Sequence, residues 1–348
     1  MCRNIHRTKL DILIIYYISM SKIYILGAGL SGIYSKLENK NSILIDKSDF
    51  ITLSTRLIYI IKGEEKSYGY KKRNIDINEE IKDINFDKKT IITGNNNYSY
   101  DRLIIALGHR QNIDKLKGSE FLYKLETVDD VLKIVESLKS AKNINIIGGG
   151  YLGVELAGVF KDKHVNLIES NNRLLSGSNE KSSNYIYNLL KNNNVNIILN
   201  SRVSEVKENS VIIGDNEIKS DLTIYSGGIS GNSLINNLKI KSIDSRIVVD
   251  KYLKSVDYDD VYACGDSMTM DNSIPMTAEI ARESGKTAMK NAMGNEIEFN
   301  YKLRNIINVA DNYILINNNS FIKGFAVKVI KNHVKKNMEE SLKKLNSE

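Results

Sequence analysis

Two glycine-rich stretches of the same form constrain this chain most. Residues 22–32 read KIYILGAGLSG, and residues 144–158 read INIIGGGYLGVELAG. In each, a short apolar run typical of a buried parallel strand leads into G-x-G-x-x-G and then into a helical pattern. The first glycine permits the tight turn, the second lets a pyrophosphate approach the backbone, and the third lets helix and strand pack closely. We therefore expect two dinucleotide-binding units.

Each unit has an acidic residue at the end of its second strand. Asp46 lies nineteen residues after Gly27, and Glu169 lies twenty-one residues after Gly148. A carboxylate in this position accepts hydrogen bonds from ribose hydroxyls and repels a 2′-phosphate. The second unit is therefore expected to prefer NADH to NADPH. Arg173 lies nearby in the sequence and is interpreted as a solvated loop cation.

Composition and charge narrow the class of protein. The chain has 348 residues and a net charge of +7, and seven lysines against three glutamates between Ser320 and Glu348 contribute +4 of it. A basic surface near the C-terminus is therefore expected. The only cysteines are Cys2 and Cys264, without a CxxC, which excludes a redox pair of that type and a zinc knuckle. The histidines show no metal-ligand spacing, so no metal site is predicted.

The segment before the first unit is unusual. Its apolar run at 12–18 is too short to span a bilayer, and no small-residue cleavage site follows it. We interpret Met20 as the true start and residues 1–19 as an N-terminal extension or a misplaced start.

Two further segments complete a recognisable order. YDRLIIALG at 100–108 is a strand entering a glycine turn, and VYACGD at 261–266 is a strand ending in a glycine and an aspartate. With GAGLSG, ILIDK, GGGYLGVELAG and NLIE, they resemble the two-dinucleotide-binding flavoproteins of the pyridine nucleotide-disulfide oxidoreductase superfamily, over roughly residues 21–291. The resemblance is strongest to the type II NADH dehydrogenases.

The resemblance implies an α/β fold with two Rossmann-like domains, the NADH domain inserted into the FAD domain, and a small C-terminal segment with a basic amphipathic helix. FAD-binding parts are expected at 20–110 and 241–296. The NADH-binding domain is expected at 111–240, and the C-terminal region, a membrane or dimer contact, at 297–348.

The resemblance also implies the cofactor sites. The residues expected to bind FAD are Gly27, Gly29, Gly32, Asp46, Gly108, Gly265, Asp266 and Ala278, with Asp266 on the ribityl chain and Gly108 in the crossover. Those expected to bind NADH are Gly148, Gly150, Gly153, Glu169 and Gly228. Glu155, on the first turn of the second helix, is expected to position the nicotinamide, or else to be a favourable acid at a helix N-terminus.

Many members of this superfamily pass electrons from flavin to a cysteine pair. The stretch that follows ILIDK contains no cysteine, and Cys264 lies inside the flavin motif, where we expect a packed, inert thiol. Disulfide reductases, coenzyme A disulfide reductases, cysteine-dependent NADH oxidases and sulfide:quinone reductases therefore fit poorly. The acceptor is expected to take electrons directly from the flavin.

A helix expected after Pro275 bears on the acceptor. AEIARE, at 278–283, resembles the AQxAxQ quinone-site pattern of type II NADH dehydrogenases, which implicates Ala278, Glu279 and Glu283. Both glutamines of that pattern are glutamates here, and a carboxylate accepts but does not donate unless it is protonated. The alternative is a surface helix with solvated acids.

Residues 321–336 show helical spacing of apolar residues. The expected apolar face consists of Ile322, Phe325, Ala326, Val329, Ile330, His333 and Val334, and lysines at 328, 331, 335 and 336 mostly occupy the other face. Such a helix docks on an anionic membrane, or covers a core or a dimer partner. The resemblance to type II NADH dehydrogenases favours the membrane.

The resemblance to type II NADH dehydrogenases implies an NADH:quinone oxidoreductase with FAD, on the cytoplasmic face of the membrane. The alternatives are a soluble NADH-dependent ferredoxin or rubredoxin reductase and a non-enzymatic flavin redox sensor. A basic surface suits an acidic ferredoxin as well as anionic lipid. No nucleic-acid partner is expected, and a homodimer stays open.

Overall fold

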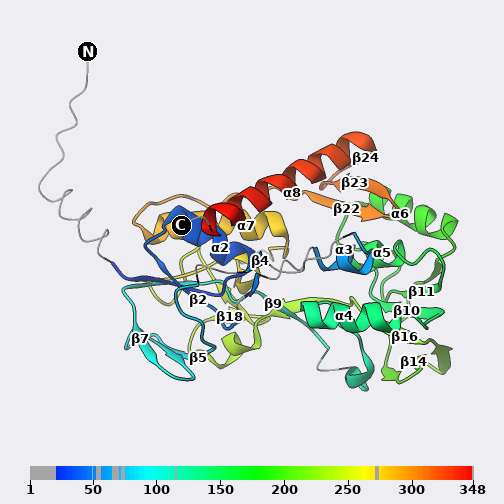
Figure 1. Ribbon diagram of the computed structural model, residues 1–348, viewed down its shortest axis with the longest axis horizontal. Coiled ribbons are helices and arrows are strands. Elements are labelled where there is room, and N and C mark those ends of the chain that lie inside the picture. The colour runs from blue at the N-terminus through cyan, green and yellow to red at the C-terminus, as the bar shows by residue number, and fades with distance from the viewer. Residues whose placement is uncertain are drawn as a thin grey trace, which may run out of the picture.

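The computed structural model describes residues 21–48, 50–51, 56–64, 70–71, 75–113, 116–270 and 274–346. The predictions for residues 1–19, for Met20 and for Cys2 lie outside the described residues. Figure 1 shows two lobes side by side, with a long C-terminal helix that runs over both.

The first lobe is built on a parallel sheet of four strands in the order β2-β1-β8-β20. The strands are β1 (Ile23–Leu26), β2 (Ile43–Ile45), β8 (Arg102–Ile105) and β20 (Val261–Ala263). Every residue of β1 is buried, which explains its uninterrupted apolar run. Since β20 joins this sheet more than 150 residues after β8, the intervening chain is an insertion.

Two helices pack together beside this sheet. They are α2 (Leu30–Glu38) and α7 (Ala278–Ala292). Gly285 allows their close approach, because a Cβ there would overlap the carbonyl oxygen of Ser31. The lobe also contains small strands and two 3₁₀ turns, namely β3 (Phe50–Ile51), β4 (Tyr70–Lys71), β5 (Ile81–Asn85), β6 (Thr90–Thr93), β7 (Asn97–Ser99), β18 (Ser242–Ile243), β19 (Arg246–Val248), β21 (Met268–Thr269), η3 (Ser233–Asn237) and η4 (Gly265–Ser267).

The second lobe repeats the arrangement with the order β12-β11-β10-β16, again parallel. Its strands are β10 (Asn143–Ile147), β11 (His164–Ile168), β12 (Asn196–Ile198) and β16 (Leu222–Tyr225). Its helices are α4 (Val128–Ser137), α5 (Tyr151–Ala157) and α6 (Glu180–Asn192), and it also contains η2 (Ser119–Phe121) and the antiparallel strands β13 (Glu205–Lys207), β14 (Ser210–Ile213) and β15 (Asn216–Lys219).

Two short strands carry the chain between the lobes. β9 (His109–Gln111) and β17 (Ile229–Gly231) pair antiparallel, so the outward and return crossings lie side by side. The predicted fold class, with the second Rossmann-like unit inserted into the first, is confirmed. The predicted domain ranges remain a proposal, and the packing of Leu238 and Ile240 in the core of the first lobe favours a return to that lobe before residue 241.

The C-terminal region contains β22 (Asn305–Val309), β23 (Asn312–Ile316), β24 (Phe321–Lys323) and α8 (Phe325–Asn346). The three strands form an antiparallel sheet whose apolar residues join the core of the second lobe, as do those of α3 (Leu57–Ile61). From there α8 runs back to the first lobe, where Leu342 and Leu345 pack on Ile33 of α2 (Figure 1).

The predicted helix at 321–336 is wrong at both ends. Phe321–Lys323 pairs with β23 as a strand, and Gly324, at φ +101°, makes the turn into α8. Ile322 therefore belongs to a strand, while the helix continues to Asn346. None of the described helices is long and apolar enough to cross a membrane.

Candidate functional site

The first glycine loop connects β1 to α2. Gly27 has φ +100°, and a Cβ there would overlap the carbonyl oxygen of Ala106, while a Cβ at Gly32 would overlap that of Gly27. Gly29 differs from both, because no atom lies within 4 Å of the position that a Cβ would take there. It caps α2 with an extended backbone and without a side-chain hydrogen bond. The loop is thus packed at its two ends and open in the middle, which fits a backbone that a pyrophosphate approaches.

Asp46 closes this loop from the end of β2. Its Oδ2 accepts the backbone N–H of Ala28 at 2.6 Å, and its Oδ1 accepts that of Ser48 at 2.8 Å. The carboxylate is therefore held at the mouth of the glycine loop, where the sequence predicts a contact with ribose.

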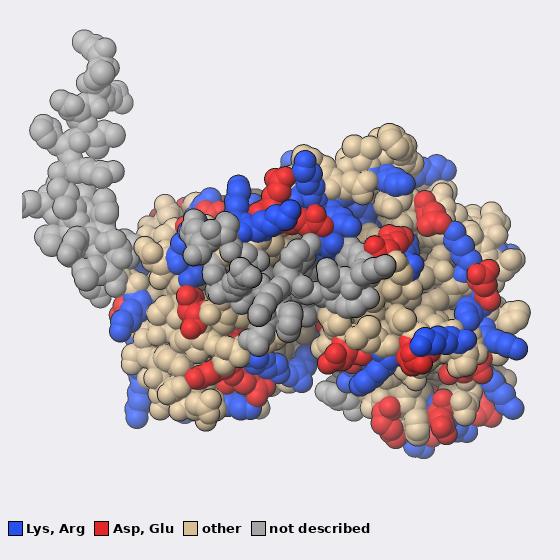
Figure 2. All heavy atoms as spheres, viewed as in Figure 1, with Lys and Arg blue, Asp and Glu red and all other residues tan. Residues whose placement is uncertain are grey.

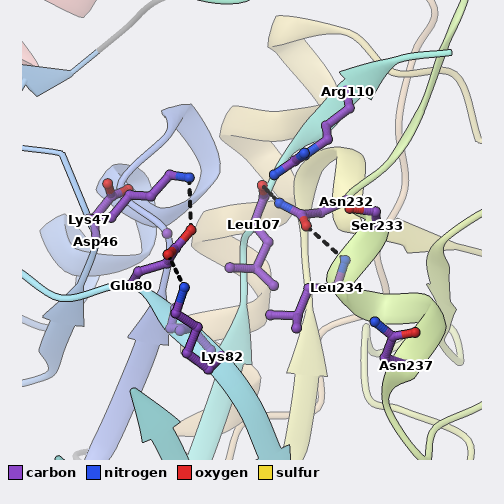
Figure 3. Close-up of a pocket in the computed structure, with 12 residues that line it drawn as sticks. Asp46, Lys47, Glu80, Lys82, Leu107, Arg110, Asn232, Ser233, Leu234 and Asn237 are labelled. Atoms are coloured by element: carbon purple, nitrogen blue, oxygen red, sulfur yellow. Dashed lines mark hydrogen bonds and ion pairs between the residues drawn. The ribbon is translucent and has the colours of Figure 1, made fainter. Parts of the chain in front are cut away.

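Gly27 and Asp46 also line a cavity of about 330 Å³ at the edge of the first sheet. Figure 3 shows Lys47, Glu80 and Lys82 on one side of it and Arg110 and Asn232 on the other. Glu80 pairs with Lys82 and with Lys47 at 3.1 Å, and these bonds lower the pKa of its carboxyl to about 2. Lys47 ends the ILIDK motif, but no motif marks the other four residues, which come from three segments that are distant in the sequence.

Gly108 and Gly265 lie on the far side of the loop. The N–H of Gly108 donates to Ser267 Oγ at 3.0 Å. Gly265 has φ +62°, and a Cβ there would lie 2.5 Å from the Oγ of Ser31 in the first turn of α2.

Asp266, next to Gly265, pairs with His109, and Ala278 begins α7 after the capping residue Thr277. The structure thus gathers the predicted FAD residues around the start of α2, and both the open glycine and the anchored acids fit this cofactor.

The second glycine loop, between β10 and α5, has the same construction. Gly148 has φ +106°, and a Cβ there would lie 2.5 Å from the carbonyl oxygen of Ser226, while a Cβ at Gly153 would overlap the carbonyl oxygen of Gly148. No atom lies within 4 Å of the equivalent point at Gly150. Gly228, at φ +131°, follows shortly after Ser226, whose Oγ donates to the carbonyl of Gly148.

Glu169 is buried beside this loop. It accepts the N–H of Gly149 at 2.6 Å and that of Asn171 at 2.7 Å. Arg173, interpreted as a solvated cation, instead donates to the carbonyls of its own loop, to Ser178 at 3.0 Å among others. The Arg173 guanidinium therefore stabilises the conformation of that loop through hydrogen bonds.

Glu155 lies in the second turn of α5, not the first. Its Oε1 accepts the N–H of Asn308 at 2.7 Å and lies 3.3 Å from Lys331 Nζ of α8. Although burial alone would lower the pKa of Lys331, Glu155 and Tyr59 raise it. The carboxylate is thus anchored to the C-terminal region, and its role toward nicotinamide remains a prediction.

The predicted quinone residues lie on the first turns of α7. Glu279 and Glu283 are half-buried, and Glu283 lies 2.8 Å from Arg282 Nε and 3.2 Å from Lys286 Nζ. Burial would raise the pKa of Glu283, but the two cations outweigh it and lower that pKa. The side chain is therefore an anionic acceptor of hydrogen bonds, which a glutamine would not be.

Cys264 is completely buried at the end of β20. Burial raises the pKa of its thiol to about 12, against the hydrogen bonds of Ser31 and Ser35, which lower it. The expected packed thiol is confirmed, and because thiolate is the reactive form, the raised pKa supports the prediction that it is inert.

The apolar face of α8 points away from the protein. Phe325 is 80% exposed, and Val329, Ile330 and Val334 are also exposed, as is Ile322 of β24. The opposite face packs inward through Val327, and Lys328 and Lys335 there lie over the rings of Tyr313 and Tyr59. Figure 2 shows uncharged surface at the upper right, over the start of α8, with Lys and Arg side chains around it. Among the described residues, this face covers no core of the chain.

Comparisons with known proteins agree with this architecture. The NADH dehydrogenase-like protein YutJ of Bacillus subtilis is 28% identical over 49% of this chain and 51% of its own length. The type II NADH:quinone oxidoreductase of Haemophilus influenzae is 28% identical over 55% of each chain. The chain thus spans about half the length of these curated relatives. The solved structure of Plasmodium falciparum NDH2 in complex with NADH has a TM-score of 0.77 at 19% identity, covering 88% of this chain and 92% of its own, and shows a shared fold.

The sequence pattern of the pyridine nucleotide-disulphide oxidoreductases matches residues 21–285, which is well over half of the chain and includes both glycine loops. The resemblance predicted from the motifs is thereby confirmed, and this chain belongs to the pyridine nucleotide-disulphide oxidoreductase family.

Proposed function

We propose that this protein is an FAD-dependent NADH:quinone oxidoreductase that works at the cytoplasmic surface of a membrane. The outward apolar face of α8 carries the proposal. An exposed apolar surface with Lys and Arg side chains around it (Figure 2) suits an anionic bilayer surface. A relative with the corresponding name adds support.

The two glycine loops support FAD at the first unit and NADH at the second. Gly29 and Gly150 leave the backbone open to a pyrophosphate, and Asp46 and Glu169 are held where ribose hydroxyls would donate to them. FAD bound at the first unit would supply the chemistry, taking a hydride from NADH and giving two electrons to the acceptor.

The state of Cys264 supports direct transfer to the acceptor. A buried thiol that stays protonated does not exchange with a disulfide, and no other cysteine occurs among the described residues. Residues of this chain therefore bind and orient the reactants, and a thiol relay is not needed.

Contacts that run from α7 through α2 to α8 support an acceptor site near α8. Lys286, which pairs with Glu283, lies 5.3 Å from the ring centre of Tyr34 on α2, and Tyr34 donates to Ser341 of α8 at 3.3 Å. Ala278 and Glu279 lie one turn before Glu283 on α7. The proposed quinone residues are thus connected through Tyr34 of α2 to the C-terminal half of α8.

The acceptor is tested by steady-state oxidation of NADH with three acceptors in turn: a short-chain quinone, a reducible ferredoxin or rubredoxin, and dioxygen. We expect kcat/KM to be highest with the quinone. A higher value with the iron–sulfur or rubredoxin acceptor would replace this proposal by the soluble reductase. A protein that binds FAD and NADH but turns over with none of the three would favour the redox sensor.

The membrane contact is tested with Phe325→Glu and a matched control, Leu132→Glu on α4, which is also exposed, at 42%. Burial of a phenylalanine side chain contributes about 1.5–3 kcal/mol. Phe325→Glu should therefore weaken partition into vesicles with anionic lipid at least about tenfold, while Leu132→Glu should not. Binding that is unchanged in Phe325→Glu, together with sedimentation of the wild type as a dimer that this variant breaks, would assign the apolar face of α8 to a second copy.

A further inference from the structure

His109 makes a contact that neither the glycine motifs nor the proposed electron path uses. It is the first residue of β9, the outward crossing between the lobes, and its Nδ1 lies 2.6 Å from Oδ2 of Asp266 in η4. Both side chains are largely buried. The contact joins residues 157 positions apart, directly at the carboxylate predicted to bind the ribityl chain of FAD.

Hydrogen bonds hold the residues on both sides of Asp266, but they do not orient its carboxylate. Gly265 is fixed by its donation to Ser284 Oγ at 2.9 Å, and Ser267 accepts the N–H of Gly108. The bond from His109 occupies Oδ2, one of two carboxylate oxygens, and thereby sets the side-chain rotation that presents the other.

We infer that His109 is a positioning residue for FAD: it holds Asp266 in the orientation that receives a ribityl hydroxyl, and its proton couples FAD affinity to pH. This inference rests on the proposal that FAD binds at the first unit.

The charges around His109 set the sign of the coupling. Burial lowers its pKa, but the bond to Asp266 and the charges of Asp266 and Glu126 outweigh burial, so the pKa is raised. Glu126 accepts the N–H of Gln111 on the same strand. The group is therefore protonated at a higher pH than a free histidine.

Arg246, a buried cation on β19, also interacts electrostatically with Asp266 and with Asp244. Its charge does not change over the relevant pH range, so His109 is the group that titrates beside the carboxylate.

FAD carries two negative charges in its pyrophosphate, and Asp266 neighbours the start of α2, as the approach of Gly265 to Ser31 requires. An imidazolium in this groove attracts the cofactor, whereas a neutral imidazole does not. FAD should therefore bind most tightly below the raised pKa of His109, and affinity should fall as pH rises through it. Because solvent partly screens a single charge here, we expect a decrease of about threefold.

The test measures the affinity of the flavin-free protein for FAD at several pH values from about 6 to about 8.5, a range that brackets the ordinary histidine pKa. Binding is monitored in each titration by the quenching of flavin fluorescence. The variants are His109→Asn, which places an amide donor where Nδ1 stands, and His109→Phe, which keeps a ring but removes the donor. His164→Asn, on the exposed start of β11, is the control. Thermal unfolding of each flavin-free protein separates folding from binding.

The wild type and His164→Asn should show the decrease with pH. His109→Asn should bind FAD with an affinity that does not depend on pH, and His109→Phe should bind at least about tenfold more weakly at every pH, because the carboxylate loses its charge-assisted partner. A pH profile of His109→Asn equal to that of the wild type, or full affinity in a folded His109→Phe, would overturn the inference. A wild type that takes up no FAD at any pH would instead refute the proposed cofactor. If His109→Phe does not fold, the profile of His109→Asn still decides.

Discussion

The last two glycines of the second nucleotide loop should respond oppositely to the same substitution. Gly150 has φ −73° and ψ −173°, a conformation open to alanine, and no atom lies within 4 Å of the added methyl group. Where the backbone conformation suits alanine, a Gly→Ala change stabilises a protein by about 0.4–1 kcal/mol, because it reduces the conformational entropy of the unfolded chain. Gly150→Ala should therefore fold with an unchanged or slightly higher Tm.

The methyl group of Gly150→Ala would nevertheless stand where the pyrophosphate of NADH approaches. Loss of one hydrogen bond to a charged group costs about 1.5–3 kcal/mol, which is a factor of roughly 10–150 in affinity. The cofactor NAD⁺, which does not reduce flavin, allows this to be measured by isothermal titration. FAD content should stay at the wild-type level, because the first loop is untouched.

Gly153→Ala is the matched control on the same helix. Its methyl group would overlap the carbonyl oxygen of Gly148 and lie 2.7 Å from Ser226 Oγ. Overpacking of this kind costs about 1–3 kcal/mol, so Tm should fall by several degrees. Wild-type affinity of Gly150→Ala for NAD⁺ would refute the assignment of this loop to the pyrophosphate. A Gly153→Ala protein as stable as the wild type would refute the packing argument.

Three further outcomes are expected. Glu169→Ala should narrow the preference for NADH over NADPH by about tenfold, because removal of the carboxylate removes repulsion of a 2′-phosphate; equal kcat/KM for the two cofactors in the wild type would show that the acid has been misread. Cys264→Ala should retain turnover with every acceptor, since the thiol stays protonated; loss of turnover with FAD still bound would restore a thiol relay. On α8, Val327→Ala should lower the free energy of unfolding by about 2 kcal/mol, as expected for a buried side chain, and should leave vesicle binding unchanged. Val329→Ala should weaken vesicle binding and leave the free energy of unfolding unchanged, because Val329 is exposed. Equal effects of the two variants on urea unfolding would contradict the orientation of the helix.

The sequence was informative where the determinants are local. Each glycine loop, its strand and its acid lie within about two dozen residues, and the physical demands on each position are distinct. The structure places Gly27, Gly32, Gly148 and Gly153 against the backbone and leaves the middle glycines open.

Prediction failed where partners are distant in the sequence. Helical spacing from Ile322 onward was genuine, but pairing with β23 overrode it for the first three residues, and only Gly324 signalled the turn. The anchoring of Glu155 depends on Asn308 and Lys331, more than 150 residues away, and cavity residues such as Glu80, Arg110 and Asn232 lie outside every motif.

The path of α8 has a mechanical consequence. β9 and β17 cross between the lobes side by side, and two adjacent strands form a hinge that permits rotation about one line. α8 makes a further connection, tied to the second lobe through Lys331 and to the first through Leu342 and Leu345, in addition to α3 and the segment from α7 to β22. Each connection away from the two strands restricts rotation about them. Removal of the helix after Ser320 would therefore loosen the two cofactor lobes relative to each other as well as detach a surface contact. A point substitution in the exposed apolar face of α8 therefore tests membrane binding without altering the connection between the two lobes.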